Sequence, residues 1–509
     1  MIPKPPFAND LTLEQELEAF RTLKPRLIEV WDALTAADES HCTSVVVPSL
    51  TLDQGELSSL AGAAYYEERL LFLLIRLRNP LAHMVYVTSQ PVHPSILDYY
   101  LNLLAGVPAS HARARLTMLC CHDASPRALT QKIIERPRLV QRIRDAVPEQ
   151  RRAYLTVFNS TPLERKLAVL LGIPLNGLDP ELQYYGTKSG SRRVFREAGV
   201  PLPEGFEDLR DESDVAKALV ELRQSRPGIR RAIVKLNDSF SGEGNAVVDY
   251  PVEPRGDVSA ALAALAVPAS AGSRSTYFEE LHRMGGVVEE YVEAAEKHSP
   301  SVQLRTSPRG EVLPISTHDQ ILGGPHGQTY LGCRFPARDD YRLAISAMAS
   351  RIGDVLAAKG VVSRFGVDFL AARQRPGDPW ALSALEINLR LLGTTHPFLA
   401  LSFLTGGHLD PATGQFLSIG GRPKFYRATD NLRSDRYRTL GPDDVIDIVT
   451  DNRLHYSHRT ESGVLFHLIG AVSEFGKLGV TAIANNAEEA DALYEHTLQV
   501  LDTETAYGQ

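Results

Sequence analysis

Three features of the sequence predict a mixed α/β protein that begins with a mainly parallel sheet. The chain has 509 residues, enough for about three domains that each bury a core. Short apolar runs alternate with helical patterns over residues 1–180, which is typical of parallel strands joined by helices. Beyond residue 181, apolar strands flank turn-rich loops, and this pattern predicts smaller α+β units.

The first unit, residues 1–180, contains four expected strands. Each is a run of four to six mainly apolar or β-branched residues. The strands are expected at 44–47, 83–88, 116–121 and 154–158, with helices at 94–105 and 162–171. Because parallel strands need crossover connections, we expect one sheet with helices on its faces.

Two further units are expected to follow. The second, residues 181–415, shows helical patterns at 187–198, 276–284 and 341–359, and strands at 232–236, 246–250 and 286–292. The third, residues 416–509, is expected to form a small α/β domain that ends in a strand at 480–484 and a helix at 487–500.

Composition and charge exclude several classes of protein. The net charge is −8 and no basic block contains interleaved aromatic residues, so nucleic acid is not an expected partner. The four cysteines show no metal-ligand spacing and are expected to be reduced thiols. The N-terminus lacks a secretory pattern, and the most apolar stretch, 70–75, is too short to cross a membrane. A cytoplasmic protein is expected.

The strongest local signal is a predicted hairpin around the turn residues 376–378. If the hairpin is centred on Gly377, Asp368 lies opposite Glu386, because each is nine residues from the centre. Asn388 then shares the face of Glu386, since side chains alternate along a strand. Three oxygen-bearing side chains would converge on one point, as a magnesium ion prefers.

The register decides this geometry, because a slip of one residue would move Asp368 to the other face. The alternative is an ordinary hairpin whose polar side chains face solvent. Arg390 favours the metal and phosphate interpretation, since it follows on the face of Glu386 and a guanidinium binds phosphate oxygens.

Two weaker signals precede the hairpin. In AIVKLNDSFSGEGNAVV, residues 232–248, Lys235 stands on a short strand before a serine- and glycine-rich turn that could hold a phosphate chain. In GGVVEEYVEAAEK, residues 285–297, an apolar strand ends in two glutamates, as in the hinges that grip adenine. Taken alone, the first fits a flexible hairpin tip and the second an amphipathic strand end.

Together, these elements and their order resemble the ATP-grasp superfamily. A helix-borne lysine (Lys188), the lysine strand with its loop, the Glu-Glu pair, Asp368 and E-x-N-x-R at 386–390 follow one another over about 200 residues. The resemblance covers roughly residues 184–407. EINLRLLGTTHPF, followed by LALSFLTGG, is most similar to the peptide ligases of the pheganomycin type. The resemblance implies a pre-ATP-grasp α/β domain at 1–180 and an ATP-grasp core of two α+β subdomains, with a lid at about 190–290.

The resemblance also implies ATP and Mg²⁺ as cofactors and assigns roles to matching residues. ATP-binding residues would be Lys188, Lys235, Ser241, Gly242, Gly244, Glu289, Glu290, Val292 and Glu296. Metal ligands would be Asp368, Glu386 and Asn388, and the catalytic residues Arg390 and Lys235. Glu296 is the implied ribose ligand, and a short insertion after the hinge would move that role to a residue such as Glu293.

Substrate contacts are harder to place. Arg305, His318, Asp319, Gln320 and His396 could face the cleft, although an ordinary structural hydrogen bond is an equal alternative for each.

The implied function is an ATP-dependent ligase that joins a carboxylate to an amine. ATP would phosphorylate the carboxylate, and the amine would attack the acyl phosphate to form an amide (peptide) bond, releasing ADP and phosphate. The substrates would be small molecules or peptides, and a homodimer is a candidate assembly. The alternatives are an ATP-grasp kinase or acyl-CoA synthetase, or a non-catalytic nucleotide-binding module, which would not need the full phosphoryl-transfer set.

Overall fold

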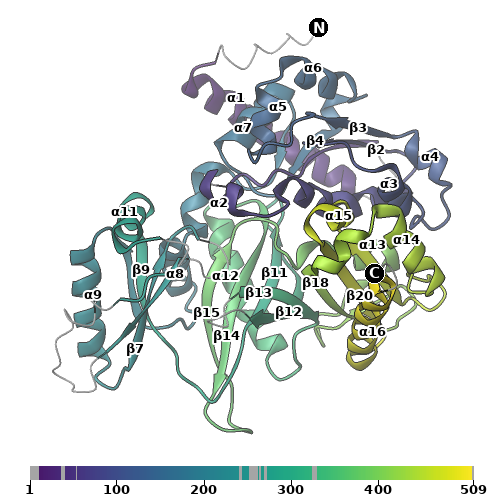
Figure 1. Cartoon of the computed structure of the whole chain (residues 1–509). Coiled ribbons are helices and arrows are strands. Elements are labelled where there is room, and N and C mark those ends of the chain that lie inside the picture. Colours follow the sequence, from purple (N-terminus) through teal and green to yellow (C-terminus); the bar gives the residue numbers. More distant parts are fainter. Residues whose placement is uncertain are drawn as a thin grey trace.

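The computed structural model describes residues 11–35, 41–52, 54–239, 244–250, 262, 265–268, 272–323 and 329–506. It confirms the expected mixed α/β fold class. Figure 1 shows a helix-flanked sheet at the N-terminal end, a large sheet in the middle and a smaller sheet set to one side.

The N-terminal sheet is parallel throughout. Its order is β3-β2-β1-β4-β5, and each neighbouring pair runs in the same direction. The strands are β1 (Cys42–Val47), β2 (Ala82–Thr88), β3 (Leu116–Cys120), β4 (Ala153–Val157) and β5 (Leu175–Asn176). The helices are α1 (Leu13–Thr35), α2 (Gln54–Ser59), α3 (Pro94–Leu101), α4 (Ala109–Arg113), α5 (Leu129–Ile134), α6 (Pro137–Asp145) and α7 (Pro162–Leu171), with the 3₁₀ segments η1 (Ala63–Arg78) and η2 (Gln150–Arg152). The four expected strands are all present.

The central sheet carries the candidate site. Its order is β10-β14-β11-β12-β13-β18-β20-β19, and β15 pairs with the other edge of β14. Its first strands are β10 (Glu296–His298), β11 (Pro300–Thr306), β12 (Val312–Gly323), β13 (Thr329–Phe335), β14 (Ser363–Arg373) and β15 (Ala381–Asn388). Helix α12 (Arg342–Ala358) packs on one face, where Phe365, Val367 and Phe369 of β14 are buried. The other face is therefore the one open to polar groups.

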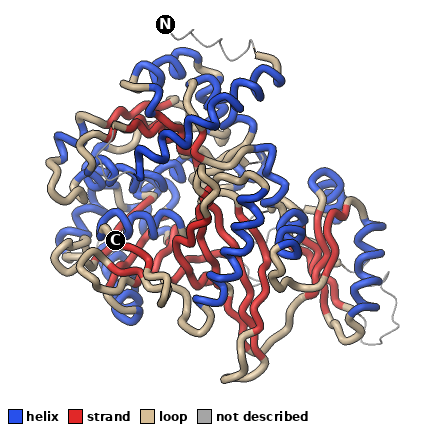
Figure 2. Tube along the Cα trace, turned by 180° about the vertical axis from the view of Figure 1, so that it is seen from behind, coloured by secondary structure: helices blue, strands red, loops and turns tan. Residues whose placement is uncertain are grey.

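A four-stranded antiparallel sheet forms the predicted lid region (Figures 1 and 2). Its order is β6 (Gly205–Leu209), β9 (Gly286–Glu290), β7 (Arg231–Leu236) and β8 (Asn245–Asp249). Helices α9 (Glu212–Ser225) and α11 (Arg274–Met284) share a core with one face of this sheet, through Leu219, Val234 and Leu281. The loop η3 (Pro180–Gly186) leads into α8 (Lys188–Glu197), which contacts β6, β9 and β15 and so joins the small sheet to the central one.

The C-terminal segment extends the central sheet. Its elements are α13 (Thr395–Thr405), β16 (His408–Leu409), β17 (Phe416–Leu417), β18 (Phe425–Arg433), η5 (Asp435–Thr439), α14 (Pro442–Asp451), β19 (Gly463–His467), η6 (Ile469–Ala471), α15 (Val472–Phe475), β20 (Lys477–Ala484) and α16 (Ala487–Ala506). Leu71 and Tyr86 of the N-terminal unit share one hydrophobic core with Phe466 and Leu478. The division of the chain into three domains at residues 180 and 415 stays a proposal. The first boundary is supported by β5, the last strand of the N-terminal sheet, which ends at Asn176. None of the described helices is long and apolar enough to span a bilayer.

Candidate active site

The predicted carboxylate cluster forms on β14 and β15. Asp368 pairs with Glu386, and Gly366 with Asn388, as the expected register requires. The two oxygens of Asp368 accept hydrogen bonds from Nε2 of Gln320, at 2.8 Å, and from Nδ2 of Asn388, at 3.0 Å. The three predicted oxygen ligands therefore lie together, and Gln320 reaches them from β12.

A β-bulge sets this register. Near the turn, Ala372 pairs with Ala381, and a uniform ladder from there would put Asp368 opposite Leu385. The ladder shifts between Asp368 and Phe369, so that Leu385 has no cross-strand partner. The extra residue restores the pairing of Asp368 with Glu386 and points both carboxylates to the same face.

The electrostatics of the cluster suit a hard cation. Burial and the facing Glu386 carboxylate raise the pKa of Asp368 to about 7, and Arg390 opposes the shift. Like charges directly across a strand pair repel each other, and a divalent cation between them would remove the repulsion. Although no described group holds three or more His, Cys, Asp or Glu side chains, two carboxylates and an amide fit magnesium, which takes its remaining ligands from phosphates and water.

Lys188 extends the cluster toward the lid. It is the first residue of α8, whose N-terminus is capped by the Thr187 hydroxyl. Its Nζ lies 3.6 Å from Oε1 of Glu386 and donates to Oγ of Ser239 at 3.1 Å. The lysine therefore bridges the carboxylates and the start of the predicted lid loop.

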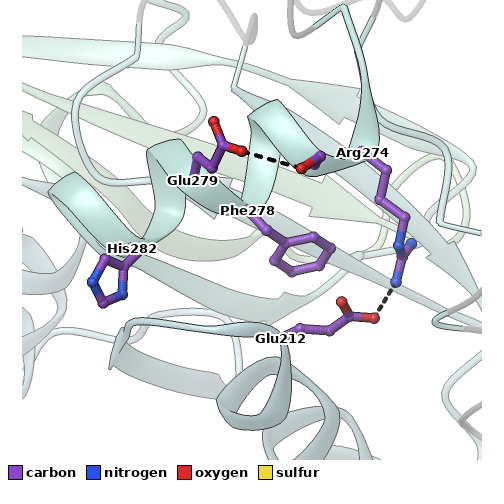
Figure 3. Close-up of a pocket in the computed structure, with 6 residues that line it drawn as sticks. Glu212, Arg274, Phe278, Glu279 and His282 are labelled. Atoms are coloured by element: carbon purple, nitrogen blue, oxygen red, sulfur yellow. Dashed lines mark hydrogen bonds and ion pairs between the residues drawn. The ribbon is translucent and has the colours of Figure 1, made fainter.

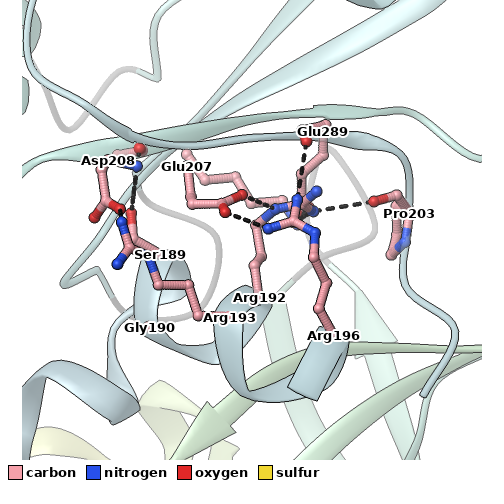
Figure 4. A network of polar contacts seen from close by, with 12 residues as sticks. Ser189, Gly190, Arg192, Arg193, Arg196, Pro203, Glu207, Asp208 and Glu289 are labelled. Carbon is pink, nitrogen blue, oxygen red and sulfur yellow. Dashed lines mark hydrogen bonds and ion pairs between the residues drawn. The ribbon is translucent and has the colours of Figure 1, made fainter. Parts of the chain in front are cut away.

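Lys235 is held by the buried carboxylate of Glu289, which Figure 4 shows beside Arg192. Its Nζ donates to Oε2 of Glu289 at 2.5 Å, and Arg192 donates to Oε1 of Glu289 at 2.7 Å. Burial raises the pKa of Glu289, but the two cations outweigh that effect and hold it below its usual range. Because both oxygens are engaged, we expect this carboxylate to position Lys235 rather than to contact adenine.

The backbone just beyond the Glu-Glu strand offers one amide that could meet a purine. Glu290 N–H bonds to Glu204 O at 2.8 Å, and Tyr291 N–H bonds to Arg231 O at 3.0 Å. Among the described residues, none accepts from the Val292 N–H, two residues beyond the end of β9. The Glu290 carboxylate accepts from the N–H of Glu204 at 3.1 Å.

The predicted lid loop is described only at its ends. Ser241 and Gly242 lie outside the described residues. Gly244 closes the loop, because its carbonyl accepts from Leu236 N–H at 3.1 Å. A Cβ at Gly244 would come within 2.5 Å of the Ser239 side chain, so the turn requires glycine here.

Glu296 is not placed with the nucleotide residues, and this corrects the predicted ribose contact. It pairs with Arg373 on β14, five positions along from Asp368, and therefore projects from the opposite face. Its carboxylate accepts from Arg373 at 2.6 Å and contacts His298 at 3.0 Å. The alternative, Glu293, accepts from Arg231 at 2.8 Å.

Of the five predicted substrate contacts, Asp319 projects from the other face of the sheet, and His318 and His396 are buried against other residues, so their substrate roles stay predictions. Asp319 points toward α12, where it accepts from Tyr341 at 2.5 Å, because it projects from the face of β12 opposite to its neighbour Gln320. His318 is fully buried and hydrogen-bonds to the Tyr426 hydroxyl at 2.6 Å. His396 is buried against His467, with 2.8 Å between their Nε2 atoms. Gln320 contacts Asp368, and Arg305 lines a separate cavity.

The burial of His318 predicts a pH-dependent stability. Burial lowers its pKa to about 3, whereas an unfolded histidine titrates near 6.5. The contribution of His318 to the free energy of unfolding is complete above pH 6.5 and is lost as the pH falls toward 3. The unfolded chain binds a proton on this histidine in that range, whereas the folded chain does not. At pH 5 this loss is about 2 kcal/mol. Thermal unfolding of the wild type and of the His318→Gln variant is measured at pH 8 and at pH 5. Between these two pH values the variant should lose less stability than the wild type. An equal loss of stability in both proteins would contradict this prediction.

The sequence interpretation missed supporting residues rather than ligands. Asn237 accepts from the N–H of Ser189 at 2.9 Å and donates to Met284 O at 3.0 Å, which fixes the start of α8 beside the lid sheet. Arg192 anchors Glu289. Strand alternation was the available signal for Arg364, which shares the face of Asp368.

An open hollow of about 610 Å³ lies on the lid unit, away from all predicted site residues (Figure 3). It lies between the start of α9 and α11. Its charged groups are already paired, since Arg274 donates to Glu212 at 2.6 Å and Glu279 accepts from Ser275 at 3.1 Å.

Family models and known structures match this architecture. The model described as IQCH-like, ATP-grasp matches residues 180–254 and 257–412, and that of the PGM1 C-terminal domain matches 444–497. The structure resembles an ADP complex of N5-carboxyaminoimidazole ribonucleotide synthetase, with a TM-score of 0.52, 14% identity and coverage of 91% of this chain and 97% of the other. It also resembles biotin carboxylase from Campylobacter jejuni, with a TM-score of 0.53, 13% identity and coverage of 89% and 90%. At these identities the shared property is the fold.

Two curated proteins are similar in sequence. IQ motif-containing protein H of Danio rerio is 26% identical over 420 residues, which are 72% of this chain and 39% of that protein. The L-propargylglycine–L-glutamate ligase of Streptantibioticus cattleyicolor is 32% identical over 469 residues, which are 91% of this chain and 94% of the relative. The chain therefore belongs to the ATP-grasp carboxylate–amine ligases of the pheganomycin type, enzymes that use ATP and Mg²⁺ to form an amide bond.

Proposed function

We propose that this ligase joins an amino-acid-like carboxylate to the amine of an amino acid or peptide, with the β14–β15 cluster as its phosphoryl-transfer site. The observation that carries the proposal is the convergence of Asp368, Glu386 and Asn388 on one face, with Lys188 at 3.6 Å from Glu386. The relative named for propargylglycine and glutamate supports an amino-acid substrate class.

Each residue of the site has a distinct role in this proposal. Asp368, Glu386 and Asn388 would hold magnesium, which neutralises the charge of the triphosphate. Lys188 and Lys235 would bind phosphate oxygens with charge-assisted hydrogen bonds. Arg390, whose charge already acts on Asp368, would stabilise the phosphoryl group as it passes to the substrate carboxylate.

Two further features complete the proposed site. The backbone at Glu290 and Val292 would meet the adenine edge, and closure of the loop that ends at Gly244 would keep water from the acyl phosphate. With water excluded, the amine is the nucleophile that displaces phosphate.

The test is ADP release from ATP and magnesium across a panel of amino acids and peptides. ADP should form only when an acid and an amine are both present. The Asn388→Ala variant should release ADP about 100-fold more slowly, because magnesium would lose one of its three protein ligands beside the transferring phosphoryl group. Asn102→Ala, at the exposed end of α3, is the matched control and should leave the rate unchanged. ADP release with an acid alone, accompanied by a stable phosphorylated product, would indicate a kinase instead.

Location and assembly are part of the same proposal. A cytoplasmic site of action fits an enzyme that consumes ATP. A homodimer is proposed as the assembly, and light scattering of the purified chain measures it directly.

A further inference from the structure

A second site lies beside the first. A cavity of about 80 Å³ is lined by residues of η1, the end of β4, β5, β11, β14 and the segment after β15. Four of its lining residues are arginines, namely Arg76, Arg305, Arg364 and Arg390. None of the described lining residues is an aspartate or a glutamate.

The arginines stand close to one another at a cost in stability. Arg305 and Arg364 are direct cross-strand partners on β11 and β14, so their side chains leave the same face. Like charges in that arrangement destabilise a sheet. Burial, together with repulsion by Arg305 and Arg76, lowers the pKa of Arg364 to about 9. Burial, with a smaller effect of Arg76, lowers the pKa of Arg305 to about 10.

The fold supplies little compensation for this charge. Arg305 donates to Oδ1 of Asn176 at 3.0 Å and lies 4.2 Å from the ring centre of Trp31, but its Nε is buried and unpaired among the described residues. Within the same described set, neither Arg76 nor Arg364 forms an ion pair. Buried charge of one sign is expensive unless an opposite charge meets it. A bound anion would meet it.

The cavity shares one residue, Arg390, with the proposed phosphoryl-transfer site. Arg390 lines the cavity and also acts on the charge of Asp368. Arg364 and Asp368 lie on one face of β14, four residues or about 13 Å apart. A substrate whose reacting carboxylate lies at Arg390 would therefore extend its other end toward Arg305 and Arg364. Asn159 and Asn176 add hydrogen-bonding groups to the same wall.

We propose that this cavity binds the non-reacting carboxylate of a dicarboxylic substrate, an acidic amino acid or a short peptide that ends in one. The proposal rests on the proposed ligase function and names the class of its acid substrate. Arg305 and Arg364 are the residues that set the preference for a second negative charge, and their forked guanidinium groups suit paired carboxylate oxygens.

Calorimetric titration with glutarate, in the presence of ADP and magnesium, tests the cavity without requiring ligation. The wild type should bind glutarate more tightly than the monocarboxylate butyrate. Arg364→Gln should weaken glutarate binding roughly 10- to 100-fold, the size expected for one or two charged hydrogen bonds. Arg375→Gln, on the exposed turn of the same hairpin, is the matched control and should bind as the wild type does. Inorganic phosphate is titrated separately, and tighter binding of phosphate than of glutarate would overturn the carboxylate assignment.

Two further measurements separate the possible failures. The Arg364→Gln variant lacks a repulsive charge, so its thermal unfolding midpoint should equal or exceed that of the wild type. If this variant does not fold, Arg76→Gln replaces it in the binding measurement. In ADP release, Arg364→Gln should lose the preference for glutamate over glutamine. Equal glutarate binding by wild type and variant would refute the cavity proposal and leave the ligase intact. Glutarate binding that depends on Arg364, with no ADP formed from any acid and amine, would support the cavity and refute the proposed ligase roles.

Discussion

Replacing Asp368 with asparagine should lower kcat/KM for ADP release by about 1000-fold or more. The substitution keeps the size of the side chain and removes one of the two carboxylate charges. Its new NH2 group replaces one of the two oxygens that accept from Gln320 and Asn388, so one of those amides must turn to offer its own oxygen. Magnesium would lose a ligand at the point where the triphosphate must be neutralised. Steady-state ADP release, measured over a magnesium titration, gives both the rate and the apparent metal affinity.

The stability of this variant distinguishes a site residue from a structural one. Asp368 faces Glu386 across the strand pair, so removing its charge should leave the thermal midpoint unchanged or raise it. Asp378→Asn, at the exposed turn of the same hairpin, should alter neither rate nor stability. A large fall in the midpoint of Asp368→Asn, in step with the loss of activity, would show that the carboxylate serves the fold.

Replacing Glu289 with glutamine should destabilise the lid sheet by about 3–5 kcal/mol, the usual cost of stranding a buried charge. Glu289 is 2% exposed and Arg192 is 1% exposed, so neither charge can turn to solvent. Lys235 loses its anchor in the same change, and we expect a parallel rise in the KM for ATP. Thermal unfolding of the variant gives the loss of stability, and ATP titration of the same preparation gives the KM for ATP.

The neighbouring glutamate provides a matched control. Glu290 is partly exposed, and its carboxylate lies 3.4 Å from Arg226 at the surface, so Glu290→Gln should change stability by less than about 1 kcal/mol. Arg192→Met combined with Glu289→Leu should recover much of the stability, because an apolar pair can replace a buried ion pair. Failure of the double variant to recover would mean that the contacts of Arg192 with Glu207 and Pro203, or the lost partner of Lys235, dominate.

Local sequence patterns predicted many of the elements and the convergence of Asp368, Glu386 and Asn388 on one face. Turn residues located the β14–β15 hairpin, and alternation placed Asn388 beside Glu386. The Leu385 bulge was not visible in the sequence, because one extra residue leaves no distinct pattern. The prediction centred the hairpin on Gly377, but the pairing near the turn differs from that centre by one residue. The bulge at Leu385 cancels this difference, and only for that reason does Asp368 face Glu386 as predicted.

Contacts between distant segments could not be predicted. Asp319 and His318 are adjacent, yet one faces α12 and the other a core built with Tyr426, and only the assembled sheet decides which. The arginine cavity combines residues from η1 and from two strands more than 200 positions later in the chain. A single sequence without pairing information contains no signal for such a convergence.

The core shared by the two ends of the chain has a consequence for biosynthesis. Leu71 and Tyr86 leave the ribosome early, but Phe466 and Leu478, which cover the same core, are made about 400 residues later. At typical elongation rates this interval is about 20–80 s. Throughout this interval the nascent chain exposes apolar surface, so its native packing must wait until Phe466 and Leu478 have left the ribosome, and holding chaperones are natural companions of its synthesis.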